Sequence, residues 1–236
     1  MTGCVVLLSL GRHPVSDRAR LAPDEAAAIS LAVRAGLSPA LVYAGPAISE
    51  PVLRRGLGLG AAKLAILAIG PEEDPVEPLC DWLAAEQPEI VVTGMRAETG
   101  EGSGMLPHLL AARLRRPLVS DCTGLEQSAD GAWIAWRAVR GGSRRLLGLS
   151  GPAILAVGPR AAPASLGSHA LAWRGAVRQF SPSAARDPRH ENPLVPARAV
   201  PPPLHRVETE LAGAARTVTC PDDAATAILE FLRSAR

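Results

Sequence analysis

Four short apolar runs, each followed by a segment with helical features, occupy the first half of the chain. The runs are residues 4–10, 40–43, 64–69 and 90–93. Helices are expected over residues 23–34, 48–59 and 75–86 and from residue 105 onward. They are indicated by apolar spacing, by proline or acidic residues at their starts and by glycine at their ends. Strands that alternate with helices through short loops favour a parallel sheet covered on both faces. We therefore expect an α/β fold of the adenine-nucleotide-binding, Rossmann-like type.

The pattern changes after Pro117. Asp130-Gly131 lies between two segments read as strands, near residues 125–126 and 133–139, and this dipeptide is typical of a β-hairpin. A further strand near residues 145–149 follows the turn at Gly141-Gly142, and the apolar run 153–157 is expected to return to the sheet. Residues 1–158 are thus predicted to form one α/β domain with an antiparallel extension.

A proline-rich segment follows this domain. Residues 159–215 contain repeated prolines and little periodicity, which is unusual inside a compact domain. The segment is predicted to be either a disordered tail or an arm that lies on a partner. Residues 216–236 then suggest a short strand and an amphipathic helix, and such a helix needs a surface on which to pack.

A glycine-rich loop between the run 90–93 and the helix from residue 105 is the main candidate site. It contains Gly94, Gly100, Gly102, Gly104 and Ser103. A strand, a glycine loop and a helix together direct backbone N–H groups and the positive end of a helix dipole toward an anion. Neither the Walker A motif nor the dinucleotide fingerprint is present. The loop therefore has two readings: a phosphate site, or an ordinary turn in which Ser103 caps the helix.

Composition excludes several function classes. The net charge of +2 is too small to predict a nucleic-acid surface. The four cysteines are scattered without metal-ligand spacing, so no metal site is expected. The chain has no apolar run of membrane-spanning length and no signal-peptide pattern, so we expect a cytoplasmic protein without membrane insertion. No nucleophile–base arrangement is recognisable, and we expect no catalytic residues.

Six stretches, in the same order and spacing, give the chain a resemblance to a known family. It is similar to the beta (small) subunit of electron transfer flavoproteins over nearly its whole length. Pro23-Asp24-Glu25 matches the family's N-P-x-D-E, and residues 87–94 and 97–104 match its Q-P-D-L-V-x-x-G and its A-x-D-x-D-T-G-Q loop. The other matches are residues 45–61, residues 141–153 and residues 218–233.

This resemblance implies a heterodimer with a larger alpha subunit that holds most of the contacts to one FAD. Electrons would come from a dedicated flavin dehydrogenase and pass to a quinone oxidoreductase. The family's beta subunit also binds a structural AMP. The positions that match its nucleotide-binding residues are Leu10, Ala22, Pro23, Asp24, Ala44, Glu101, Gly102, Ser103 and Gly104.

The chain also departs from the family pattern. The segment between Leu10 and Pro23 is shorter than usual and lacks the family's hairpin and tyrosine, which leaves Arg12 and His13 as candidates to face the flavin. Thr99 and Gly104 replace the second aspartate and the glutamine of the nucleotide loop. Leu166 lies where the family has the leucine that anchors dehydrogenases, and an ordinary apolar residue in an arm is an equally good reading.

Two other functions remain open at this point. The first is a stand-alone nucleotide-binding domain of the stress-protein type that would form a homodimer. The second is an electron-bifurcating flavoprotein subunit with a second FAD in the place of AMP. The proline-rich segment and the closing helix speak against the first, and the shortened first loop gives no support to the second.

Overall fold

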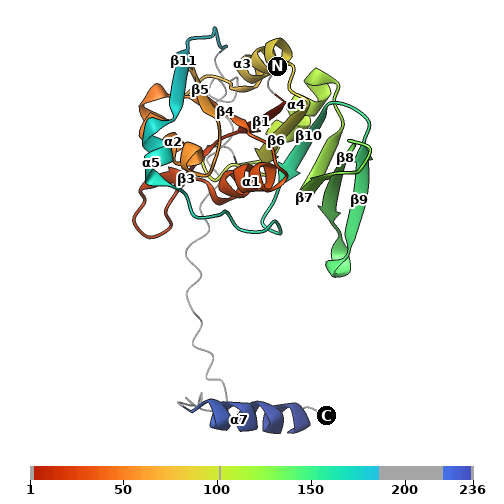
Figure 1. Cartoon of the computed structure of the whole chain (residues 1–236). Coiled ribbons are helices and arrows are strands. Elements are labelled where there is room, and N and C mark those ends of the chain that lie inside the picture. Colours follow the sequence, from red (N-terminus) through yellow and green to blue (C-terminus); the bar gives the residue numbers. More distant parts are fainter. Residues whose placement is uncertain (1–2, 101, 186–219, 235–236) are drawn as a thin grey trace, which may run out of the picture. The chain divides into compact units, whose positions relative to one another are not determined.

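A computed structural model describes residues 3–100, 102–185 and 220–234 of the 236-residue chain. The chain divides into two units, Met1–Asn192 and Pro193–Arg236. The first contains the α/β domain, and the described part of the second forms the helix α7 (Pro221–Ser234). Figure 1 shows these elements in sequence colours.

The centre of the domain is a sheet of nine strands in the order β11-β5-β4-β1-β6-β10-β7-β8-β9. The strands from β11 to β7 run parallel to one another. Their bounds are β1 (Cys4–Leu7), β4 (Ala40–Gly45), β5 (Lys63–Ala68), β6 (Ile90–Gly94), β7 (Leu118–Gln127), β10 (Ala153–Val157) and β11 (Ala176–Phe180). The predicted α/β class with a mainly parallel sheet is confirmed.

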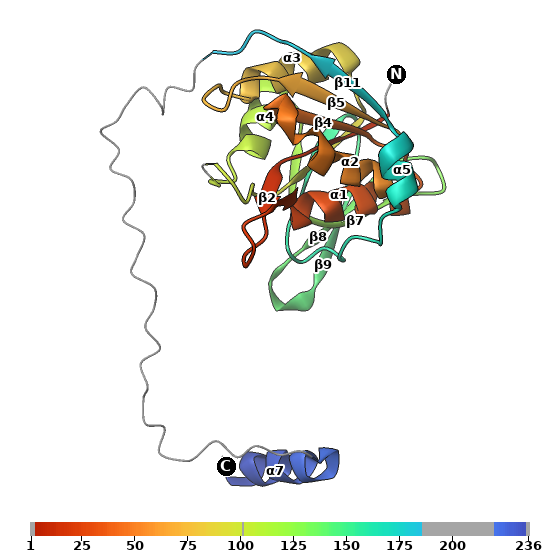
Figure 2. The same ribbon diagram turned by 90° about the vertical axis from the view of Figure 1, so that its left-hand side faces the viewer.

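Helices cover both faces of this sheet, as Figure 2 shows. On one face α1 (Pro23–Arg34) and α2 (Glu50–Gly58) bury Ile29 and Leu53 against alternate strand residues. On the other face α3 (Val76–Glu86) and α4 (Leu106–Leu114) bury Leu83 and Leu110. The central strands are therefore apolar at successive residues, and this explains why their sequences read as continuous apolar runs.

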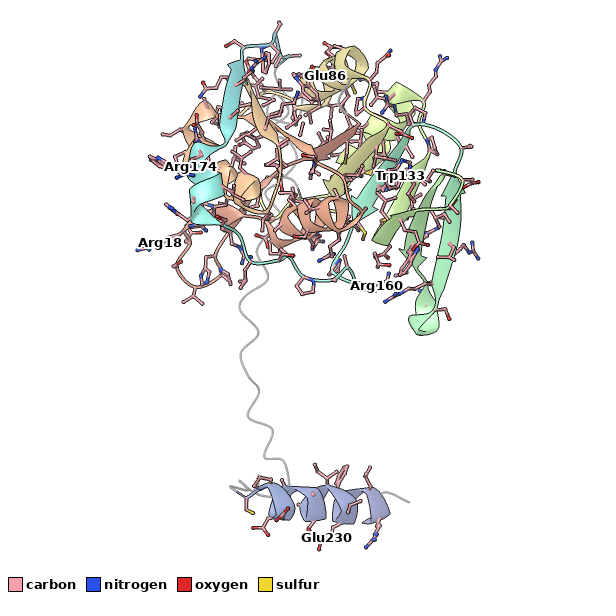
Figure 3. The ribbon with its side chains drawn as sticks, viewed as in Figure 1. Arg18, Glu86, Trp133, Arg160, Arg174 and Glu230 are labelled. Atoms are coloured by element: carbon pink, nitrogen blue, oxygen red, sulfur yellow. The ribbon has the colours of Figure 1, made fainter. Side chains whose placement is uncertain are left out.

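The predicted antiparallel extension is also present. Strand β8 (Trp133–Ala138) pairs antiparallel with β7 and with β9 (Arg144–Leu149). Trp133, labelled in Figure 3, is buried, whereas Trp136 contacts Arg144 at 5.4 Å from the ring centre to the guanidinium carbon. At the end of β10, Arg160 pairs with Asp121 of β7 and fastens the outgoing chain to this side of the sheet.

Two parts of the domain differ from the expectation. The first strand ends at Leu7, and the segment between Leu10 and Pro23, which was expected to lack the family's hairpin, contains a short hairpin of β2 (Leu10–Arg12) and β3 (Ala19–Leu21). That expectation was wrong. The two short strands of the hairpin are partly exposed, so they lack the apolar alternation that identifies a strand.

The second difference lies in the proline-rich segment. Residues 169–180, for which no regular structure was predicted, form the helix α5 (His169–Arg174) and the edge strand β11. Arg54 of α2 holds α5 in place, because its guanidinium donates to the carbonyls of Ala172, Trp173 and Gly175. The predicted strand at residues 216–219 lies outside the described residues, as does most of the predicted arm. The role of this arm in partner binding stays a prediction.

Helix α7 matches the predicted closing helix, with the apolar residues Ile228, Leu229 and Leu232 exposed. In the described part of the chain, no helix is both long and apolar enough to cross a membrane.

Candidate functional site

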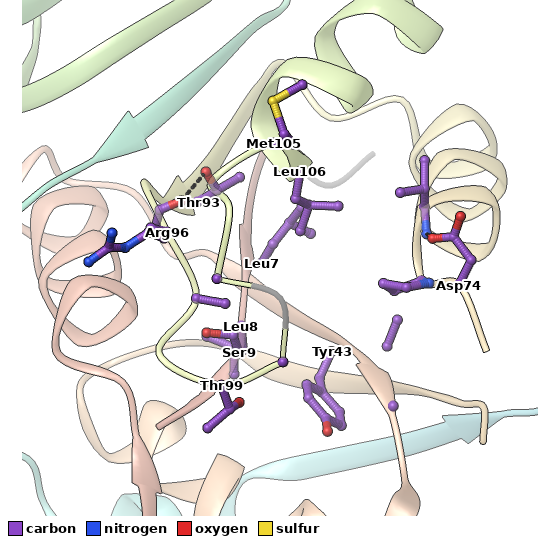
Figure 4. Close-up of a pocket in the computed structure, with 18 of the residues that line it drawn as sticks. Leu7, Leu8, Ser9, Tyr43, Asp74, Thr93, Arg96, Thr99, Met105 and Leu106 are labelled. Atoms are coloured by element: carbon purple, nitrogen blue, oxygen red, sulfur yellow. Dashed lines mark hydrogen bonds between the residues drawn. The ribbon is translucent and has the colours of Figure 1, made fainter. Parts of the chain in front are cut away.

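A cavity of about 820 Å³ opens at the carboxyl ends of β1, β4, β5 and β6. Its volume is within the roughly 300–1,000 Å³ that small-molecule sites occupy. Leu8 and Ser9 follow β1, Ala44 and Gly45 end β4, and the segments after β5 and β6 complete the lining. Figure 4 shows Ser9, Tyr43, Thr93 and Arg96 around this space.

The position of the cavity follows from the strand order. From β1 the chain moves outward through β4 to β5 and then returns to the opposite side of β1 as β6. The loops after β1 and β6 consequently diverge and leave a crevice between them. Such a switch point is where open α/β sheets bind their ligands.

The glycine loop between β6 and α4 forms one wall of this crevice. Gly100, Gly102 and Gly104 have φ values of 76°, 59° and 76°, a region that residues with a Cβ rarely occupy. A Cβ on Gly104 would also lie 3.0 Å from the carbonyl oxygen of Met95. The Ser103 hydroxyl accepts a hydrogen bond from the Met105 N–H at 3.2 Å, which supports the start of α4. The loop thus brings backbone N–H groups and the positive end of α4 to the cavity.

The start of α1, unlike the start of α4, carries acidic side chains of its own. Asp24 and Glu25 occupy its first turn, so the chain's own carboxyl groups take the place of an external anion there. Glu25 is buried and lines the cavity, and one of its oxygens accepts a hydrogen bond from the Ser9 hydroxyl. The pKa of Glu25 is raised to about 7, mainly by burial and also by the nearby Asp24 and Glu98, against the lowering effect of hydrogen bonds from Ser9 and from its own backbone N–H.

The hairpin β2–β3 is tied to the glycine loop. Arg20 forms an ion pair with Glu98 at 2.8 Å, and the Thr99 hydroxyl donates to the Leu10 carbonyl at 2.8 Å. A Cβ on Gly11 would collide with the Glu98 carboxylate where it now lies, so a larger residue would displace this side chain. The two loops therefore hold each other in place at the mouth of the site.

The predicted nucleotide residues lie in or beside the cavity. Ala44, Gly102, Ser103 and Gly104 line it. Leu10, Ala22, Pro23 and Asp24 are neighbours in sequence of the lining residues Ser9 and Glu25, and within the described residues they do not themselves line the cavity. Glu101 lies outside the described residues. Binding of a nucleotide by these residues stays a prediction.

The residues proposed for flavin contact and docking lie elsewhere. Arg12 and His13 are exposed on the hairpin, where Arg12 pairs with Asp17 at 2.8 Å. The His13 Nδ1 atom accepts hydrogen bonds from the N–H groups of Val15 and Ser16. Leu166 is completely exposed before α5. Their roles stay predictions.

Sequence reasoning missed part of the lining. The segment after β5, which includes Ile69, Gly70 and Asp74, contributes to the cavity, although none of its residues was predicted to belong to the site. The rule that parallel strands end at one edge of the sheet would also have predicted this fourth loop. Glu25 was read only as a residue of the helix start, because its burial depends on contacts with β1 and β6. Within the described residues, no group of three metal-ligating side chains gathers that could hold an ion.

Comparison with known proteins agrees with this geometry. Residues 15–185 match the family model of the electron transfer flavoprotein domain. The chain is 35% identical over 247 aligned residues to the electron transfer flavoprotein subunit beta of Chromohalobacter salexigens, an alignment that covers 97% of this chain and 92% of that protein. The chain therefore belongs to the electron transfer flavoprotein family, in its beta-subunit branch.

Proposed function

We propose that this chain is the small subunit of a heterodimeric electron transfer flavoprotein. It pairs with an alpha subunit that holds most of the contacts to one FAD, receives electrons from a dedicated flavin dehydrogenase and delivers them to a quinone oxidoreductase. The chain itself makes and breaks no covalent bonds. Its membership of the beta-subunit family supports this assignment most directly.

We further propose that the cavity holds AMP as a structural nucleotide. The observation that carries this proposal is the glycine loop before α4, which reaches the switch point of the sheet with three glycines in the left-handed region. The phosphate would bind to N–H groups of this loop and to the start of α4, with Arg96 as the nearby cation in the lining. The ends of β4 and β5 would receive the base.

The FAD and the redox partners are assigned to other surfaces. The hairpin with Arg12 and His13 would face the flavin that the alpha subunit holds. Leu166 would contact the donor dehydrogenase, since it is an exposed apolar residue on a segment held by α5 and Arg54. In this arrangement the nucleotide loop and the flavin-facing hairpin are joined by the Arg20–Glu98 ion pair.

Co-expression with the candidate alpha subunit, followed by purification through a tag on this chain, tests the assignment. We expect a 1:1 complex that contains one FAD and one AMP, counted by absorbance and by chromatography of the released nucleotides. Two flavins and no AMP would contradict the AMP assignment and indicate a bifurcating subunit. A colourless homodimer would contradict the electron-transfer function.

A further inference from the structure

One carboxyl group of the cavity has an oxygen without a hydrogen-bond partner. Glu25 is only 3% exposed, and Ser9 satisfies its Oε1 atom. Its Oε2 atom is buried and has no partner among the described residues. An unpaired oxygen of this kind costs stability, so a donor from a bound molecule would be favourable at this point.

Space for this carboxyl group exists because residue 94 has no side chain. A Cβ on Gly94 would lie 2.7 Å from Oε1 and 3.2 Å from Oε2 of Glu25. The carboxyl group therefore lies directly against the end of β6, at the point where the chain enters the glycine loop. Ser9, which follows β1, lies on its other side.

The strand order places this carboxyl group at the middle of the cavity. The ends of β5 and β4, with Ile69, Tyr43 and Ala44, line one side, and the glycine loop lines the other. Strands β1 and β6 lie between them, and Ser9, Gly94 and Glu25 belong to this central part. A nucleotide whose phosphate binds the glycine loop and whose base reaches β4 and β5 has its sugar over β1 and β6.

The charges around Glu25 exclude the phosphate from this central position. Asp24 and Glu98 both act on Glu25 as like charges. Of the nearby cations, Arg20 is paired with Glu98, and Arg96 of the lining acts on Asp24 rather than on Glu25. An anion placed against Glu25 would meet its carboxyl group and the negative field of Asp24 and Glu98 behind it. A neutral hydrogen-bond donor, such as a hydroxyl group, fits the unpaired oxygen instead.

We propose that Glu25 accepts a hydrogen bond from a ribose hydroxyl of the nucleotide in this cavity and thereby selects ribonucleotides over deoxynucleotides. This inference rests on the proposed nucleotide site and adds to it the residue that recognises the sugar. A hydrogen bond from a hydroxyl to a buried carboxylate is stronger than one between neutral groups. Loss of the ligand hydroxyl leaves the Oε2 atom unpaired again.

The test compares AMP with 2′-deoxy-AMP and 3′-deoxy-AMP by isothermal titration calorimetry. It uses the complex with the alpha subunit after bound nucleotide has been removed, at pH 8, where the carboxyl group is ionised. We expect AMP to bind roughly tenfold or more tightly than at least one deoxy analogue. In Glu25→Ala this preference should fall to within about twofold, whereas Glu89→Gln, a change at an exposed carboxylate, should leave it intact.

The remaining outcomes separate the two proposals. A preference that persists in Glu25→Ala, or no preference in the unaltered protein, would overturn the role of Glu25 while AMP binding itself stands. Absence of AMP binding to the unaltered protein would overturn the nucleotide site and this inference together. If Glu25→Ala does not fold, Glu25→Gln serves instead. Ser9 would then bind the amide oxygen, and the amide N–H could donate to the ribose hydroxyl only as a neutral hydrogen bond, so the preference should fall below that of the unaltered protein.

Discussion

Replacement of Glu25 by glutamine should stabilise the protein at alkaline pH and have little effect at acid pH. Burial raises the pKa of this carboxyl group in the folded chain from its ordinary value of 4.5 to about 7. Between these values the unfolded chain has released its proton and the folded chain retains it. Unfolding therefore becomes easier as pH rises through this range. Glutamine keeps the shape and the contact with Ser9 but does not titrate.

The magnitude follows from the two pKa values. Their difference of roughly 2.5 corresponds to about 3 kcal/mol of stability, which is present below pH 4.5 and is lost by the time the pH exceeds 7. The free energy of unfolding of Glu25→Gln relative to the unaltered chain should thus increase by about 3 kcal/mol from pH 4.5 to pH 8. All other titratable groups are common to both proteins, so the difference reports Glu25 alone.

Urea unfolding followed by circular dichroism at a series of pH values measures this difference. The full chain is used at one fixed protein concentration without added nucleotide. Glu89→Gln, at an exposed position, is the matched control and should give a difference that is small at every pH. A constant difference between Glu25→Gln and the unaltered chain from pH 4.5 to pH 8 would refute the reasoning, because it would mean that Glu25 titrates alike in both states.

Three further predictions concern the glycine loop, the anchoring of α5 and β11, and the β2–β3 hairpin. Gly104→Ala should weaken AMP binding at least tenfold in calorimetry, whereas Gly36→Ala, which has a similar φ of 79° and open space around it, should cost comparable stability and leave AMP affinity unchanged. Arg54→Ala should speed amide hydrogen exchange in α5 and β11 at least tenfold, since charge-assisted bonds to three carbonyls are lost; exchange as slow as in Arg55→Ala would argue against this anchor. Thr99→Val should speed exchange in the β2–β3 hairpin by removing the bond to the Leu10 carbonyl, and unchanged exchange would mean that the ion pair alone holds the two loops together.

The central strands and their helices could be predicted because burial on both faces leaves an unmistakable pattern. The α1 helix begins at Pro23 and ends at Arg34, as the sequence indicated, because the proline and the acidic pair at its start and the glycine after its end are all local signals. The glycine loop was found for the same reason. The anion binding proposed for this loop depends on its backbone conformation, and the glycine residues indicate that conformation in the sequence.

The missed elements depend on contacts between distant residues. Four of the five residues of β11 are exposed, and the strand is defined by its main-chain pairing with β5, so its side chains carry little signal. The burial of Glu25 could not be predicted from the sequence either, because it too depends on distant contacts. Its burial is set by Ser9 and Gly94, residues that the fold alone brings next to it. A carboxyl group at a helix start reads as an exposed acid until the neighbouring strands are placed.

The strand order has a consequence for the behaviour of the chain at high concentration. The sheet ends in β11 on one side and β9 on the other, and an outer strand can pair with a strand from another molecule and begin aggregation. Both outer strands carry arginine: Arg178 on β11, and Arg144 and Arg145 on β9. Two copies that approached edge to edge would bring like charges together. We therefore expect these side chains to oppose edge-to-edge pairing between copies of the chain, a task separate from electron transfer.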